Sequence, residues 1–235
     1  MAQTSVQKRP NYLVRRIFQL LIAVLLMMGI LFISAGELKW PGAWIFLAGY
    51  LGMIAVNAVF ILPRGMELIE ERAQFHKDVV SWDNWISTLL IFIGQFGGLL
   101  VAGLDRRLGW SPTLPVWLLA VGGLLMAAGY GMSSWAMITN RFFSTHVRLQ
   151  VERAHQVVDT GPYRFIRHPG YFGMFIALPG TVLLLGSLWA LIPAGIGMVL
   201  TAARTYLEDR YLHVQLSGYK EYAGRVRFRL IPGIW

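Results

Sequence analysis

The sequence predicts an all-α, polytopic integral membrane protein with about six transmembrane helices. Three observations support this fold class: a composition poor in charge, long stretches without any charged residue, and cations gathered between those stretches. Of the 235 residues, 56% are hydrophobic and only 14% are charged. Soluble proteins carry about 25% charged residues, so this chain lacks the polar side chains to cover a surface in water.

Four uncharged stretches each approach the ~20 residues that a helix needs to cross hydrocarbon. They comprise residues 17–33, 43–62, 86–104 and 114–138. The basic residues before the first stretch also resemble the start of a cleavable signal peptide. That apolar run is long for a signal peptide, and no A-x-A site follows it cleanly, so we predict a retained first span.

A fifth uncharged stretch, residues 171–203, predicts a helical hairpin. One helix of this length would be about 50 Å long, too long for a single crossing. Gly186-Ser187 near its middle indicates a tight turn between two short spans that carry Pro179 and Pro193. The fourth stretch contains glycines that indicate close helix packing: Gly122, Gly123, Gly129 and Gly131.

The placement of basic residues predicts the topology. Six spans leave 18 of the 21 Lys and Arg residues on one side of the membrane, and only Lys39, Arg106 and Arg107 on the other. Because cytoplasmic loops carry the excess of cations, we expect both termini and a helical C-terminal tail in the cytoplasm, with the protein in the cell or inner membrane. We attribute the net charge of +9 to topology and anionic lipid headgroups, not to nucleic acid.

Polar residues concentrate in residues 139–171 and 204–235, which flank the predicted hairpin and must emerge together. The string at residues 161–171 alternates turn formers with cations and aromatics. Such a segment can direct cations, an imidazole and backbone N–H groups at one ligand. Arg204 and Glu208, four residues apart, share a helix face where the last span ends.

Four motifs in this region carry a family resemblance. They are His155-Gln-Val-Val before Gly-Pro-Tyr163, the Arg-His-Pro-x-Tyr-x-Gly string from Arg167 to Gly173, the acids Glu208-Asp209, and Gly218-Tyr-x-x-Tyr222 followed by Ile231-Pro232. In this order and spacing, from about Gln150 to the C-terminus, they resemble the isoprenylcysteine carboxyl methyltransferase family. The resemblance to phospholipid N-methyltransferases is looser.

The resemblance implies S-adenosylmethionine as cofactor, bound in a cytoplasm-facing pocket. It implies catalytic roles for Arg167, Arg204 and Glu208. It implies a set of cofactor contacts: Gln150, His155, Tyr163, Arg164, His168, Pro169, Tyr171, Gly173, Glu208 and Asp209. Asp209 stands where the family usually has Glu. We expect no metal site, because the chain has no cysteine and its histidines lack ligand spacing.

We therefore expect residues 1–138 to form a four-span membrane region and residues 139–235 a catalytic region, within one integrated domain. The predicted reaction is methyl transfer at the cytoplasmic face to a lipophilic or lipidated acceptor that enters from the bilayer. A carboxylate acceptor is already ionised and would need a cation such as Arg167 to orient it. A thiol or an amine acceptor would need a base, and all three acceptors stay open.

Two other functions remain as alternatives. Membrane sterol reductases, which use NADPH, also resemble this C-terminal half, although the chain has no G-x-G-x-x-G unit. A non-enzymatic scaffold or transporter is the third reading, and the absence of charge inside every predicted span argues against an ion path. The charged loop between spans two and three, residues 63–85, is either a solvated face or a border of the substrate entrance.

Overall fold

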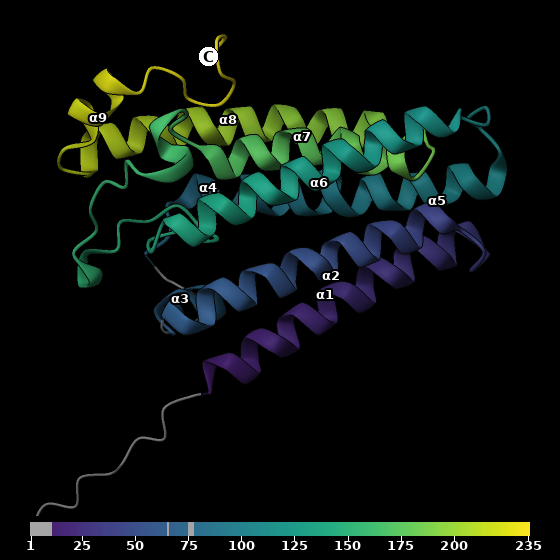
Figure 1. Cartoon of the computed structure of the whole chain (residues 1–235), viewed down its shortest axis with the longest axis horizontal. Helices are drawn as coiled ribbons and strands as arrows, with labels where there is room; N and C mark the ends of the chain where they lie inside the picture. The colour runs from purple at the N-terminus through teal and green to yellow at the C-terminus, as the bar shows by residue number, and fades with distance from the viewer. Residues whose placement is uncertain (1–10, 65, 75–77) are drawn as a thin grey trace, which may run out of the picture.

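The computed structural model describes residues 11–64, 66–74 and 78–235. Within them every regular element is a helix and none is a strand, as Figure 1 shows. Two of the basic residues before the first span, Lys8 and Arg9, lie outside the described residues. So do His76 and Lys77 of the charged loop between spans two and three. By length and hydropathy four helical segments qualify as membrane spans, and the protein is an integral membrane protein.

The first two spans are α1 (Tyr12–Ala35) and α2 (Pro41–Ile61). Asn11 caps α1 by accepting the Val14 N–H at 3.3 Å, and Gly36 ends it in the left-handed conformation. After α2 the chain makes a 3₁₀ turn, η1 (Leu62–Arg64), and the short helix α3 (Glu67–Ala73), which packs against α1. The α3 segment thereby lies within the charged loop predicted between spans two and three.

The third span is continuous but not uniform. It joins α4 (Ser81–Leu89), the π-helical segment η2 (Leu90–Gly97) and α5 (Gly98–Leu108). Gly94 lies so close to the last long helix that an added Cβ would be 3.0 Å from the Cα of Gly197. The predicted stretch at residues 86–104 is the central part of this longer helix. π-helical turns occur frequently at functional sites, and η2 contributes Leu90 and Ile91 to the cavity described below.

Glycines join α6 (Val116–Thr139) closely to α7 (Pro169–Leu184). A Cβ added at Gly122 would lie 2.4 Å from the backbone nitrogen of Leu184, and one at Gly129 would lie 2.4 Å from the carbonyl oxygen of Gly173. Close packing is therefore confirmed at these two positions. A Cβ added at Gly131 would have no heavy atom of another element within 4 Å, so the predicted packing role of Gly131 is wrong.

The predicted hairpin is confirmed as α7 followed by α8 (Leu191–Gln215). Gly186 makes the turn between them with a φ of +79°, a conformation that glycine adopts without steric cost. The α7 helix is apolar but shorter than a full span, and α8 continues beyond its apolar part into a charged end. The six-crossing topology stays a prediction.

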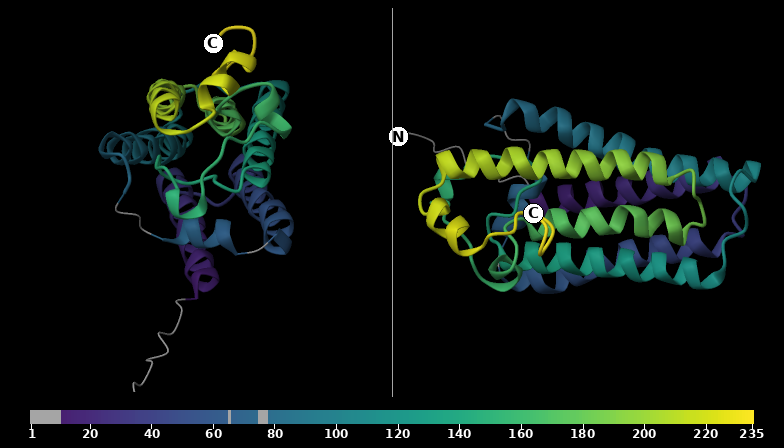
Figure 2. Two further views of the ribbon diagram at one scale, coloured as in Figure 1. Left: turned by 90° about the vertical axis from the view of Figure 1, so that its left-hand side faces the viewer. Right: turned by 90° about the horizontal axis from the view of Figure 1, so that it is seen from above.

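The chemistry-bearing segments gather at one end of the bundle. This end holds α3, the connector of residues 140–168 with its short helices η3 (Val151–Arg153) and η4 (Gly161–Arg164), and α9 (Tyr219–Arg225). The left view of Figure 2 shows the molecule from this end, with the connector and the C-terminal segment beside each other. The turns after α1, α5 and α7 lie at the opposite end, where Arg106 pairs with Glu37 at 2.7 Å.

Candidate active site

A cavity of about 300 Å³ lies at the end that holds α3 and α9. Its walls come from α3, α4, η2, the connector, α7, α8 and α9. Seven of the predicted site residues line it: His155, Tyr163, Arg167, His168, Tyr171, Arg204 and Glu208. Five others do not: Gln150, Arg164, Pro169, Gly173 and Asp209. We call this space the polar cavity.

Glu208 and Tyr171 line the polar cavity and contact each other. The Tyr171 hydroxyl donates a hydrogen bond to the Glu208 carboxylate. The ring of Tyr171 stacks on His168 with 5.8 Å between the ring centroids, and the Arg204 guanidinium lies 5.2 Å from its centroid. Among the described residues Glu208 has no ion pair within 4 Å. Its carboxylate therefore keeps acceptor capacity for a ligand.

Arg204 pairs with Asp83 of α4, not with Glu208. Its Nε donates to Asp83 Oδ1 at 2.7 Å and its Nη2 donates to Oδ2 at 3.1 Å. Asp83 is fully buried and also accepts the Val147 N–H at 2.9 Å. A buried carboxylate without a cation is costly, so the long arginine side chain reaches across to α4. No motif in the sequence singled out Asp83, whose only signal was its place as an acid in the first turn of an apolar helix.

Asp209 faces away from the polar cavity and links three segments. Its carboxylate lies 3.0 Å from Arg167 Nε, and it accepts hydrogen bonds from the Tyr219 hydroxyl at 2.9 Å and from Arg229 Nε at 2.8 Å. His168 Nε2 lies 3.4 Å from the same carboxylate. Asp209 is 1% exposed. It therefore ties the 161–171 string and the C-terminal segment to α8.

The C-terminal segment also occupies backbone groups of the 161–171 string. The Arg167 and His168 N–H groups donate to the carbonyls of Phe228 and Arg229 at 2.9 and 3.0 Å. These two N–H groups are thus not directed at a ligand, in contrast to the expectation from sequence. Tyr219 and Tyr222 line the polar cavity, and burial raises the pKa of both hydroxyls. Both therefore stay protonated at neutral pH.

Gln150 and His155 organise the connector. Gln150 is fully buried, and its Nε2 donates to the Phe142 carbonyl at 2.7 Å. The His155 ring stacks on the Phe142 ring at 4.4 Å. Burial, with Arg153 and Arg148 nearby, lowers the pKa of His155 to about 4. The imidazole is therefore neutral at neutral pH and offers an apolar face.

The charged loop is bound to the connector through Arg148, a residue that belongs to none of the sequence motifs. Arg148 is buried and pairs with Glu71 at 2.6 Å, with Asp78 at 2.8 Å and with Glu152 at 2.6 Å. The Ser144 hydroxyl donates to Glu71 at 2.8 Å. Glu71 of the loop is therefore not part of a solvated face, and a role of the loop at the substrate entrance stays a prediction. In the sequence, the signal for this contact was a run of acids in the loop, which is predicted on the same side of the membrane as the basic connector.

Three predicted cofactor contacts have other surroundings. Arg164 is exposed at the surface. Pro169 occupies the first turn of α7, where its missing N–H costs nothing. Gly173 faces α6, and a Cβ there would lie 2.3 Å from Ser133 Oγ.

The fold and the cavity define a class: a helical membrane protein with a buried polar site at one end of its bundle. The sequence model of the isoprenylcysteine carboxyl methyltransferase family matches residues 121–214, from α6 to the end of α8. The protein-S-isoprenylcysteine O-methyltransferase of Dictyostelium discoideum is 32% identical over 168 residues, which cover 68% of this chain and 69% of the relative. The chain belongs to this family and is a membrane methyltransferase.

Two plant relatives support the same family assignment. A probable protein-S-isoprenylcysteine O-methyltransferase of Oryza sativa subsp. indica is 28% identical over 132 residues, which cover 54% of this chain and 68% of the relative. Protein-S-isoprenylcysteine O-methyltransferase B of Arabidopsis thaliana is 33% identical over 114 residues, which cover 47% of this chain and 57% of the relative. The resemblance that the C-terminal motifs indicated is thereby confirmed.

Proposed function

We propose that this protein transfers a methyl group from S-adenosylmethionine to the free carboxylate of an S-isoprenylcysteine, at the end of the bundle that holds α3 and α9. The observation that carries the proposal is a pair of adjacent spaces, the polar cavity and an apolar groove. The names of the relatives supply the class of acceptor. The positive-inside distribution of charge supports a cytoplasmic position for this end.

The polar cavity suits the cofactor. Its volume of about 300 Å³ is at the lower end of the range for small-molecule sites. Glu208, without an ion pair among the described residues, can accept hydrogen bonds from an ammonium or from ribose hydroxyls. Phe142 and the neutral His155 ring offer aromatic faces for an adenine ring. We assign Glu208, Tyr171 and His155 to cofactor binding.

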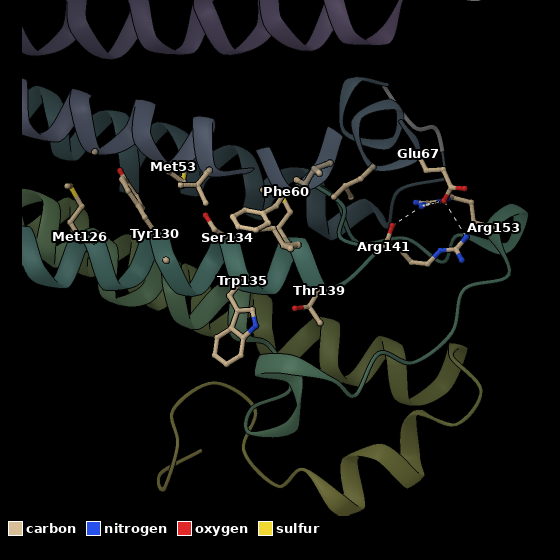
Figure 3. A pocket seen from close by; sticks show the side chains of 18 residues that line it. Met53, Phe60, Glu67, Met126, Tyr130, Ser134, Trp135, Thr139, Arg141 and Arg153 are labelled. Atoms are coloured by element: carbon tan, nitrogen blue, oxygen red, sulfur yellow. Dashed lines mark hydrogen bonds and ion pairs between the residues drawn. The ribbon is translucent and has the colours of Figure 1, made fainter. Parts of the chain in front are cut away.

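The apolar groove suits an isoprenoid chain. It has a volume of about 920 Å³ and lies between α2 and α6. Figure 3 shows Met53, Phe60 and Met126 among its lining side chains. Phe60 and Val56 are among the exposed apolar residues of α2, so the groove adjoins the surface that faces lipid. Its polar rim lies where Glu67 pairs with Arg141 at 3.3 Å and with Arg153 at 3.0 Å. An apolar chain can therefore enter from the bilayer.

The chemistry asks little of the chain beyond binding and alignment. When bound, S-adenosylmethionine supplies an electrophilic methyl group on a sulfonium. The acceptor oxygen forms the new C–O bond with its own electron pair while the S–C bond breaks toward sulfur, so no proton moves and no base is needed. The protein must hold both reactants in line and exclude water. Tyr219, Tyr222 and Leu216 cover the polar cavity for the second task.

The test combines binding and turnover in detergent. Isothermal titration should show binding of S-adenosylmethionine and S-adenosylhomocysteine but not of NADPH. Incubation with S-adenosylmethionine and N-acetyl-S-farnesylcysteine should yield the methyl ester. NADPH binding without a response to either sulfur compound would favour the reductase instead. Methylation of a phosphatidylethanolamine amine, with no ester formed, would refute the proposed acceptor.

A further inference from the structure

Four arginines line the polar cavity, and three of them have acidic partners. Arg148 pairs with Glu71, Arg167 lies 3.0 Å from Asp209, and Arg204 binds Asp83. The fourth is Arg72, on α3. Among the described residues the Arg72 side chain has no ion pair and no hydrogen-bonded acid.

The surroundings of Arg72 make its charge costly. Its guanidinium lies 5.6 Å from the ring centroid of Phe143, another residue of the cavity wall, and this cation–π contact offsets only part of the cost of burial. A second cation is close, because Arg16 Nη1 donates to the Arg72 carbonyl at 3.4 Å. Burial, and then repulsion by Arg16, lowers the pKa of Arg72 to about 10, so the side chain stays charged at neutral pH. A cation in such a place is stabilised when an anion joins it.

The position of α3 indicates which anion this is. Glu67 and Leu68 of α3 line the apolar groove, whereas Arg72 of the same helix lines the polar cavity. The connector divides in the same way: Arg141 lines the groove and Phe142 lines the cavity. The two spaces therefore share two walls. A ligand with its apolar chain in the groove would bring an anionic head past α3.

We infer that Arg72 binds the carboxylate of the methyl acceptor and selects acceptors that carry a free carboxylate. This inference rests on the proposed function. A guanidinium can hold both carboxylate oxygens with parallel N–H bonds. Methylation turns the carboxylate into a neutral ester, which loses the charge-assisted part of this interaction. The same residue thus favours substrate binding and product release.

The test compares Arg72→Gln and Arg72→Lys with the parent and with Arg210→Gln, which removes an exposed cation that lines neither space. With N-acetyl-S-farnesylcysteine, Arg72→Gln should raise KM by about tenfold or more. The KM of Arg72→Lys should lie between the values of the parent and Arg72→Gln, since an ammonium keeps the charge but not the planar fork of a guanidinium. The affinity for S-adenosylhomocysteine should change by less than about twofold in every variant.

A second readout does not depend on the stability of a variant. The carboxamide of N-acetyl-S-farnesylcysteine should compete poorly with the acid on the parent enzyme, and Arg72→Gln should lose this preference. If Arg72→Gln weakens S-adenosylhomocysteine binding and leaves the acceptor KM unchanged, the carboxylate belongs to the cofactor and the inference is overturned. Equal competition by acid and amide on the parent also overturns it. Failure of the proposed function would give a different result from failure of this inference, since the parent itself would then form no ester.

Discussion

Two neighbouring acids on α8 show how side-chain direction divides labour at the residue scale. Successive residues of a helix point about 100° apart. Glu208 therefore lines the polar cavity, whereas Asp209 points at the 161–171 string and the C-terminal segment. Sequence proximity alone suggested one joint role for the pair. The structure instead supports ligand binding by Glu208 and maintenance of the fold by Asp209.

Glu208→Gln should weaken the binding of S-adenosylhomocysteine about ten- to a hundredfold. The reason is the loss of charge-assisted hydrogen bonds that contribute about 1.5–3 kcal/mol. Isothermal titration measures the change, and Glu221→Gln, at an exposed position of α9, is the matched control. An unchanged dissociation constant would remove Glu208 from the site.

Asp209→Asn should instead lower the stability of the protein. The substitution leaves the buried Arg167 without its carboxylate and removes the charge that also faces Arg229, a change that costs about 3–5 kcal/mol in buried pairs. Thermal unfolding in detergent should show a lower midpoint, and Glu208→Gln should not show it. A midpoint equal to that of the parent would contradict the structural role.

At the element scale, the contact between α6 and α7 depends on residues without side chains. Interfaces between membrane helices favour small residues because backbones can then approach closely. Gly122 and Gly129 of α6 meet Gly173 and Gly180 of α7 in this way. The α7 helix carries His168 at its N-terminus and Tyr171 in its first turn, so this contact positions part of the cavity wall.

Gly173→Ala should destabilise the protein without a direct effect on cofactor affinity. The new Cβ would lie 2.5 Å from the Gly129 carbonyl, and such overpacking typically costs about 1–3 kcal/mol. Gly131→Ala, where the added Cβ would have nothing within 4 Å, is the control and should not destabilise the protein. Thermal unfolding and titration of the folded protein separate the two effects. Weaker S-adenosylhomocysteine binding at unchanged stability would restore Gly173 as a cofactor contact.

The connector should make the fold sensitive to acid through His155. The folded pKa of His155 is about 4, below the ordinary value of 6.5, so the unfolded chain binds the proton more readily. The stability contribution of neutral His155 is complete above about pH 6.5 and is lost as the pH falls toward 4. The midpoint temperature of thermal unfolding should therefore fall more steeply over this window for the parent than for His155→Gln. Parallel curves for the two proteins would contradict the prediction.

At the scale of the whole molecule, the two ends of the bundle differ in charge. Lys39, Arg106 and Arg107 lie at the end with the turns after α1 and α5, while the connector and α9 lie at the other. The positive-inside rule predicts that the second end lies in the cytoplasm, where S-adenosylmethionine is available. The proposed function requires this orientation.

Labelling of single cysteines tests the orientation, since the chain has none of its own. Cysteines at Lys39 and Arg107 should react with an impermeant reagent from outside the cell, and cysteines at Arg164 and Lys220 should not. All four positions are exposed, so accessibility within the fold does not confound the result. Reaction of the Arg164 position from outside would put the polar cavity on the wrong side of the membrane.

The sequence by itself determined the all-helical class, the four long spans, the hairpin and the family. Each follows from local information: hydropathy over about 20 residues sets a span, a Gly-Ser pair inside an overlong stretch sets a turn, and motif order sets the family. The residues that line the polar cavity were found in part for the same reason. His155, His168, Tyr171 and Glu208 belong to contiguous motifs near one predicted membrane face.

Only the tertiary structure decided how the buried charges are paired. Asp83 meets Arg204 across 121 positions of sequence, and Glu71 meets Arg148 across 77. No spacing rule connects such positions, because the pairing depends on which helices pack side by side and how far each arginine reaches. Once those pairs are known, Arg72 stands out as the arginine of the cavity wall that has no ion pair with an acid among the described residues. Its significance comes from the arrangement of charges in space, which the order of residues does not reveal.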